Sequence, residues 1–360
     1  MHQHRGVVKP EPASRELDAL DRKLLAALSH NVRLSPSFLG RLVHLSKDGV
    51  RYRLEKLYAT GTILGTMLVL NPYALGFRFF TLALNIRDPP LEQEQKLMAQ
   101  LASHPNTIWV GQCLGSWNLV VFFIARKDDA KSVEQAIRSL CQRSLGKAQL
   151  LEITAMHRYQ NLPGWFLQEA GMETLAATRT DVSFHKLLDK ASVSSGTAEL
   201  DGLDHAIIRA LAPDCRASIA AIAQQLNKPF NTIKSRVQQL IRKRVILACN
   251  PLANLSSLHQ IAFSAFIELA DDGERARLRE HLKRHPDTGF LFETRKPWQF
   301  EWYGAVRSNI QLHHDMESLR AQFRSIRSIT ALFIIKDHKL TFTPEIAVRQ
   351  GAAPVSGADG

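Results

Sequence analysis

Apolar side chains recur at helical spacing in the stretch from Leu45 to Tyr58. Val50, Leu54 and Leu57 share one stripe, and polar or charged residues occupy the rest of each turn. Ser46 stands where an N-cap side chain accepts a hydrogen bond from the backbone of the first turn. The pattern predicts a helix that buries one face and presents a polar, partly basic face to solvent.

Two shorter helical patterns precede this helix, at Leu20–Leu28 and at Ser35–His44, where Pro36 suits a first helical turn. A short helix, a tight turn and a helix with a polar face are typical of a helix-turn-helix, whose second helix can enter the major groove of DNA. We expect Gly61 to end that helix in the left-handed conformation and Thr62–Leu70 to form a strand or wing.

The same pattern is written twice along the chain. Glu16–Asp21 recurs as Glu199–Asp204, an offset of 183 residues (from 21 to 204). Further on, His104-Pro105 recurs as His285-Pro286, an offset of 181 residues (from 104 to 285). Chance does not maintain such matches at a nearly constant offset, so the sequence indicates an internal duplication.

Each helix-turn-helix is followed by strand and helix patterns in the order βαββαβ, which is that of a ferredoxin-like sandwich. In the first copy, strands are expected at 77–86, 107–113, 117–125 and 149–157, and helices at 91–103 and 128–145. In the second copy, strands are expected at 261–269, 289–293, 298–306 and 330–337, and helices at 273–283 and 309–323. The predicted fold class is therefore α+β, with two copies of a winged helix-turn-helix and a ferredoxin-like sandwich.

These patterns divide the chain into seven segments: a disordered tail at 1–15, a winged helix-turn-helix at 16–70, a sandwich at 71–163, a linker at 164–198, a divergent helix-turn-helix at 199–249, a second sandwich at 250–344 and a disordered tail at 345–360. The linker begins with a short helical pattern and ends in a polar run, 191–197, that is typical of a flexible connection.

Composition adds a charge argument. Lys and Arg number 46 against 34 Asp and Glu, and this excess of 12 positive charges suits a polyanionic partner, although an ordinary basic protein would show the same balance. The four cysteines show no metal-ligand spacing and are expected to be reduced thiols. No apolar run approaches the roughly 20 residues that span a bilayer, and the N-terminus lacks a signal-peptide core.

The chain resembles the Lrp/AsnC (feast/famine) family of bacterial and archaeal transcription regulators over about residues 16–163 and 199–344. The resemblance rests on Leu20-Asp21, Leu45-Ser46, Val50, Arg53-Leu54, Leu57, Gly61–Gly65, Asn71-Pro72 and Leu75-Gly76. It implies a winged helix-turn-helix for double-stranded DNA and a sandwich that senses ligands and dimerises. We accordingly expect a homo-oligomer, dimer or higher, in the cytoplasm and associated with the nucleoid.

Candidate DNA-contacting residues are the polar side chains of the two recognition helices and the basic run after the second: Ser46, Lys47, Asp48, Arg51, Tyr52, Lys56, Asn231, Lys234, Ser235, Gln238, Arg242, Lys243 and Arg244. The alternative is a solvated helix face and, for the second copy, a helix-turn-helix reduced to a scaffold. Arg53 and Arg236 lie nearer the buried stripes, so we expect internal ion pairs with the Leu-Asp segments.

The second copy departs from the family pattern. Pro229 replaces Ser46 and is expected in the first helical turn, and Arg244 replaces Gly61. The family's effector loop has a glycine, an aromatic residue and an acid, but the acid is absent here. The effector-binding candidates are Gly115, Trp117, Asn118, Trp298 and Gln299. For the two tryptophans we favour the alternative of packing.

Three functions remain open. The first is a sequence-specific transcription regulator with two heads, whose sandwiches pair within the chain or between chains. The second is an enzyme, because related Lrp/AsnC-like pairs, some of them fused in tandem, serve as sirohaem decarboxylases, but the 14 histidines do not cluster as that chemistry requires. The third is an assembly partner that does not bind DNA.

No catalytic residue, cofactor or metal site is predicted. Adjacent helical residues do not share a face, so His313, His314 and Asp315 are expected at a solvated surface.

Overall fold

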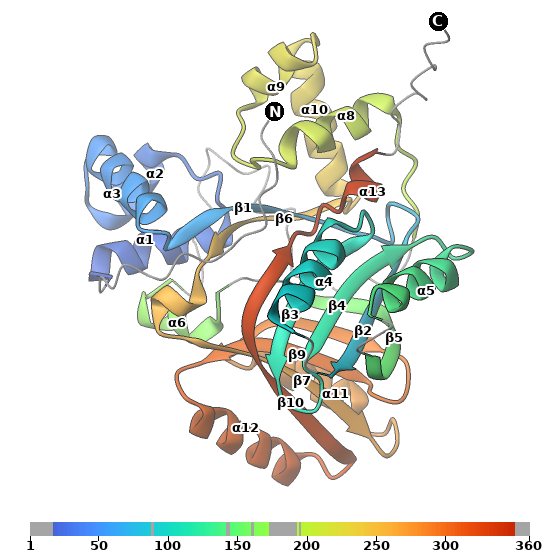
Figure 1. Cartoon of the computed structure of the whole chain (residues 1–360). Helices are drawn as coiled ribbons and strands as arrows, with labels where there is room; N and C mark the ends of the chain where they lie inside the picture. Colours follow the sequence, from blue (N-terminus) through green and yellow to red (C-terminus); the bar gives the residue numbers. More distant parts are fainter. Residues whose placement is uncertain are drawn as a thin grey trace, which may run out of the picture.

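The computed structural model describes residues 17–87, 90–141, 145–159, 162–172, 193 and 196–349 (Figure 1). The predicted tail at 1–15, most of the linker and the end of the chain after 349 lie outside these residues. Two groups of helices lie on one side of the molecule and a large barrel lies on the other, with a two-stranded ribbon between them (Figure 1).

The first group of helices, head 1, consists of α1 (Ala19–His30), α2 (Pro36–Val43) and α3 (Lys47–Ala59). Ser35 caps α2, with Pro36 in its first turn, and Ser46 Oγ accepts from the Gly49 N–H at 3.0 Å at the start of α3. The stripe on α3 is buried, and Gly61 is left-handed with φ 69°. These predictions are confirmed.

The second group, head 2, consists of α8 (Gly202–Leu211), α9 (Ile219–Gln225) and α10 (Phe230–Arg242). Pro229 is the N-cap of α10 rather than a first-turn residue, so that prediction was wrong by one position. Its fixed φ still allows the extended cap conformation, but its side chain offers no acceptor to the first turn. Arg244 adopts the left-handed conformation of Gly61, with φ 56°, although it carries a Cβ.

The strand predicted after head 1 is present as β1 (Ile63–Leu70), but it is no wing hairpin of its own head. It pairs antiparallel with β6 (Ile246–Ala253), the equivalent strand of the second copy, and Met67 lies opposite Asn250. Each head also bonds to the ribbon strand of the other copy: the Val32 N–H donates to Cys249 O at 3.1 Å, and the Cys215 N–H donates to Thr66 Oγ1 at 3.1 Å. The ribbon therefore holds the two heads together.

Each sandwich module has the predicted element order. Module 1 contains β2 (Arg78–Ile86), α4 (Leu91–Ser103), β3 (Thr107–Leu114), β4 (Leu119–Ala125), α5 (Ala130–Leu140) and β5 (Leu145–Tyr159). Module 2 follows the 3-10 turn η1 (Leu255–Leu258) and contains β7 (Ile261–Leu269), α11 (Arg275–Arg284), β8 (Thr288–Thr294), β9 (Phe300–Val306), α12 (Asn309–Gln322) and β10 (Ile326–Leu340). The main difference from the prediction is that α5 ends at Leu140 and β5 already begins at Leu145.

The two modules close one barrel, with the strand order β10-β3-β4-β2-β5-β8-β9-β7. Two seams join the copies: β5 pairs with β8, and β10 pairs with β3. The sandwiches thus pair within the chain, which settles a choice that the sequence left open. Helices α4 and α5 cover one outer apolar cluster and α11 and α12 cover another, while the largest cluster fills the barrel and continues through the ribbon into both heads.

Two short helices brace the heads against the barrel. The helix α6 (Gly164–Glu169), predicted at the start of the linker, contacts α1. The helix α13 (Glu345–Arg349) contacts α8 and buries Ala347, so the predicted disorder from 345 was wrong for these residues. Among the described residues, no helix has both the length and the apolarity to cross a membrane.

Candidate nucleic-acid interface

The polar face of α3 is open to solvent. Lys47, Asp48, Arg51 and Tyr52 are exposed, with Tyr52 at 65%, and Lys56 is half-buried with its ammonium 5.9 Å from the Tyr52 ring centroid. Arg51 Nη1 lies 3.6 Å from Asp48 Oδ1, an exposed pair that is weak in water and can open toward another anion. The face therefore combines one guanidinium, two ammonium groups, one aromatic ring and the carboxylates of Asp48 and Glu55.

Ion pairs tie α3 to the start of α1 within head 1. Arg53 Nη1 donates to Asp18 Oδ2 at 2.6 Å and to Asp21 Oδ1 at 2.7 Å, and Asp21 is buried. These hydrogen bonds raise the pKa of the Arg53 guanidinium above its usual value. Arg236 repeats the arrangement in head 2 with Asp201 and Asp204, at 2.8 and 3.3 Å, so both predicted internal ion pairs are confirmed.

The polar face of α10 carries no acid. Asn231, Lys234 and Ser235 are exposed, and Gln238 is half-buried. Phe230, which the sequence analysis did not single out, is 49% exposed at the start of the same helix. An exposed aromatic ring beside hydrogen-bonding side chains can make apolar contact with a thymine methyl group.

The three basic residues at the end of α10 differ in their exposure and in their hydrogen-bond partners. Arg242 and Lys243 are exposed and Arg244 is half-buried. Lys243 Nζ donates to Glu199 O at 2.9 Å, which ties it to the segment before α8. Of these three predicted phosphate contacts, Arg242 is the freest to reach outward from its helix.

The two predicted effector loops lie next to each other, but their side-chain amides form hydrogen bonds with backbone N–H groups. The Trp117 and Trp298 rings meet edge to face at 6.0 Å, and Trp298 stacks on Phe266 at 4.5 Å, which is the packing alternative. Asn118 Oδ1 accepts from the Ile86 N–H at 2.8 Å, and Gln299 Oε1 accepts from the Leu269 N–H at 2.6 Å. Gly115 is exposed with φ 140° in the loop before Trp117. The amides that replace the family's acid therefore hold the end of the first strand of each module.

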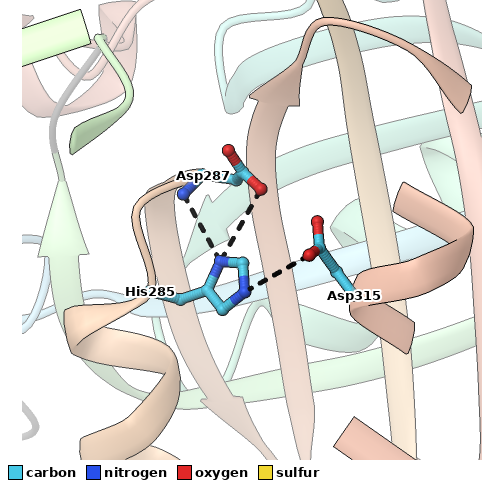
Figure 2. Close-up of side chains that lie close together, drawn as sticks. All are labelled: His285, Asp287 and Asp315. Carbon is cyan, nitrogen blue, oxygen red and sulfur yellow. Dashed lines mark hydrogen bonds and ion pairs between the residues drawn. The ribbon is translucent and has the colours of Figure 1, made fainter. Parts of the chain in front are cut away.

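In module 2, a histidine and an acid of the loop between α11 and β8 meet an acid of α12. His285 lies between Asp287 and Asp315: its Nδ1 is 3.8 Å from Asp287 Oδ2, and its Nε2 is 3.9 Å from Asp315 Oδ1 (Figure 2). Burial and the neighbouring Asp315 raise the pKa of Asp287 to about 7, and burial lowers the pKa of His285 to about 4.

These are metal-ligating residue types, and their ligand atoms lie within 4.8 Å of one another. The acids, however, face opposite nitrogens of one imidazole, and Gln311 Nε2 already donates to both Asp287 oxygens, at 3.0 and 2.9 Å. His285 Nδ1 also accepts from the Asp287 backbone N–H at 3.4 Å, so a bound ion would have to displace existing hydrogen bonds. Asp315 thus points inward, while His313 and His314 are exposed as predicted.

The four cysteines are buried free thiols, as predicted. Burial raises the pKa of Cys113, near the first effector loop, to about 12, which keeps this thiol protonated and unreactive at neutral pH.

Two helix-turn-helix heads on a shared ribbon define the class of fold to which the chain belongs. An AsnC-type helix-turn-helix domain matches twice, at residues 17–58 and 200–241. The chain therefore contains two AsnC-type helix-turn-helix domains, one in each copy.

Among curated relatives, an uncharacterised HTH-type transcriptional regulator of Pyrococcus abyssi is 33% identical over 100 residues, 27% of this chain and 61% of that protein. The proline dehydrogenase transcriptional activator of Rhizobium radiobacter is 46% identical over 61 residues, 17% of this chain and 39% of that protein. The chain thus spans less than two thirds of either relative's length.

Among solved structures, the siroheme decarboxylase NirDL in complex with an iron-uroporphyrin III analogue gives a TM-score of 0.55 at 11% identity. The match covers 92% of this chain and 96% of that chain. At this identity the likeness shows that the two chains share a fold over nearly their whole length, including the tandem arrangement.

Proposed function

We propose that the chain is a sequence-specific DNA-binding transcription regulator of Lrp/AsnC type. In this proposal the two ferredoxin-like modules serve assembly and small-molecule sensing, and the partner is double-stranded DNA in the nucleoid of a bacterium or archaeon. Further copies of the chain join through surfaces outside the barrel seams. The observation that carries the proposal is that both recognition helices keep their polar faces exposed while one ribbon holds both heads.

The two heads differ in chemistry. The face of α3 offers Arg51, which suits guanine, whereas α10 offers Asn231 and Gln238, which suit adenine. Because one chain carries both faces, its operator is expected to be two unlike half-sites rather than a palindrome.

The cavity between barrel and ribbon does not suit the enzyme alternative. The cavity between barrel and ribbon holds about 100 Å³, and Asp337 is the one charged residue in its lining. A tetrapyrrole is far larger than such a space, and its carboxylates require basic partners. The shared fold with NirDL therefore supports the architecture but not that activity.

The test measures binding of the full chain to sites recovered by genome-wide mapping and to random duplexes, over a range of salt concentrations. Arg51→Ala is expected to weaken operator binding by about 10- to 100-fold and random binding by much less, because a base contact is worth about 1–3 kcal/mol. Arg327→Ala is the matched control, since it removes the same charge from an exposed site on β10.

Lys234→Ala tests head 2 in the same assay. A loss of affinity and a shallower salt dependence show that α10 contacts DNA, whereas unchanged binding shows that head 2 is a scaffold. Absence of operator binding by the parent chain, together with a spectral change on adding an iron tetrapyrrole, would favour the enzyme instead.

A further inference from the structure

A cavity of about 100 Å³ lies where the ribbon meets the barrel. Leu64 of β1 and Leu252 of β6 line it on the ribbon side, and Trp109, Phe122 and Tyr303 line it on the barrel side. These three rings contact one another at centroid distances of 5.0 to 5.7 Å, so the barrel wall is a packed aromatic cluster.

The internal duplication explains why the space is hollow. The lining residues Ala262, Gly289 and Ala305 of module 2 stand at positions where module 1 has the larger residues Phe79, Ile108 and Ile124. All three larger side chains are buried in the core.

The register of the strands supports this alignment. Phe79 lies opposite Ile124 in module 1, and Ala262 lies opposite Ala305 in module 2. Thr107 and Thr288, one residue before Ile108 and Gly289, each donate from Oγ1 to the helix carbonyl six residues earlier, at 2.9 and 2.7 Å. Module 2 therefore lacks side-chain volume that module 1 has at the same places. Because packed surroundings relax only partly around such a gap, a cavity remains.

The lining selects the chemistry of an occupant. Apart from Asp337, its side chains are apolar or aromatic, and Asp337 Oδ1 accepts from Trp109 Nε1 at 2.9 Å. A carboxylate in an aromatic wall repels anions and attracts cations, which aromatic faces also favour. A cavity of about 150 Å³ encloses a whole benzene molecule, so this space of about 100 Å³, which is partly open to solvent, admits a single ring only with part of the molecule in the opening.

We propose that the cavity is a binding site for a small apolar amine, no larger than one ring, with its ammonium group toward Asp337. Since both ribbon strands line the cavity, an occupant bridges the head-bearing ribbon and the barrel. This regulatory consequence rests on the proposed function, whereas the binding itself does not.

The experiment uses the full chain without DNA and three probes of one shape: benzylamine, toluene and benzoate. Calorimetry and ligand-observed NMR are expected to show saturable 1:1 binding of benzylamine, weaker binding of toluene and none of benzoate. Ala305→Ile, which installs the residue of module 1, is expected to lower benzylamine affinity at least tenfold. Asp337→Asn is expected to lower benzylamine affinity while leaving that of toluene unchanged.

No binding of benzylamine, or equal binding by the parent and Ala305→Ile, overturns the proposal. Circular dichroism checks the fold of the variant, and Ala262→Val provides a smaller filling change that decides the matter if Ala305→Ile does not fold. A chain that binds benzylamine but no DNA retains this site and loses only the proposed function.

Discussion

Single charged side chains fix the heads of this protein by pairing with acids that the fold has buried. Arg53 and Arg236 are each shared between an N-cap aspartate and a second, buried aspartate one turn later. An acid buried beside its guanidinium is strongly destabilising once the guanidinium is removed.

Arg53→Met is therefore expected to lower the free energy of unfolding by about 2 kcal/mol, because Asp21 stays buried without its partner. Denaturant unfolding of the full chain measures the loss. Arg327→Met removes an arginine that is 63% exposed and pairs with Glu268, so it is expected to cost less than about 1 kcal/mol. Equal costs for the two variants would contradict the anchoring role of Arg53.

The raised pKa of Asp287 makes the stability of the folded chain depend on pH. Its pKa is about 7 in the folded chain, whereas an unfolded aspartate has a pKa of about 3.9. The folded state therefore holds the proton between these values, and the stability that this proton contributes is complete below about pH 4 and lost as the pH rises through 7.

Asp287→Asn, which installs the residue that module 1 has at Asn106, removes this dependence. Between pH 5 and pH 8 the parent is expected to lose about 1–2 kcal/mol relative to the variant, after allowance for solvent screening. Thermal or denaturant unfolding at each pH gives the difference. Asp272→Asn, at an aspartate that is 70% exposed, is the control and should parallel the parent.

At the scale of elements, helices and their ends were largely readable from the sequence. Ser35, Ser46 and the stripe of α3 act locally, within one turn of the residues they stabilise. The end of α5 was missed because the apolar pattern continues beyond Leu140 into β5, and periodicity alone does not separate a helix end from a strand start.

Strand partners could not be read in the same way. The sequence predicts β1, but its partner β6 lies far along the chain. The alternation of apolar and polar residues within a strand does not identify the strand with which it pairs. For the same reason Asp315 was placed at the surface: its contact with His285 depends on how α12 lies against β9, which local spacing does not encode.

The helix ends of the two heads provide a matched stability test. Gly61 and Arg244 share the left-handed conformation, with φ 69° and 56°. Gly61→Ala is expected to destabilise the chain by about 1 kcal/mol, because a Cβ is disfavoured there. Arg244→Gly is expected to stabilise it by about 0.5–1 kcal/mol for the converse reason. Chemical denaturation compares both with the parent, and a loss of stability in Arg244→Gly would show that the side chain contributes more than its backbone strain costs.

At the scale of the whole molecule, three strand pairings among the described residues join the two copies: β1 with β6, β5 with β8 and β10 with β3. A break in the covalent chain between the copies should leave all three in place. A protease site inserted between residues 172 and 196 is therefore expected to yield two fragments that stay together.

Size-exclusion chromatography with light scattering is expected to show a 1:1 fragment complex with the mass of the parent, and each fragment expressed alone is expected to self-pair or aggregate through its open sheet edges. Fragments that separate as stable monomers would show that the modules fold independently. Dilution of the cut complex should weaken DNA binding, because the heads then lose the effective concentration that the linker provides.

The closed barrel also limits which chains can mix. A regulator that forms its barrel from two separate polypeptides can exchange subunits with related regulators in the same cell. The resulting hetero-oligomers then combine different helix-turn-helix heads. Here β10 and β5 have already taken up the edges that a foreign subunit would need. The two heads are therefore inherited as a fixed pair, and under the proposed function a change in the target sequence of one head affects no other pair.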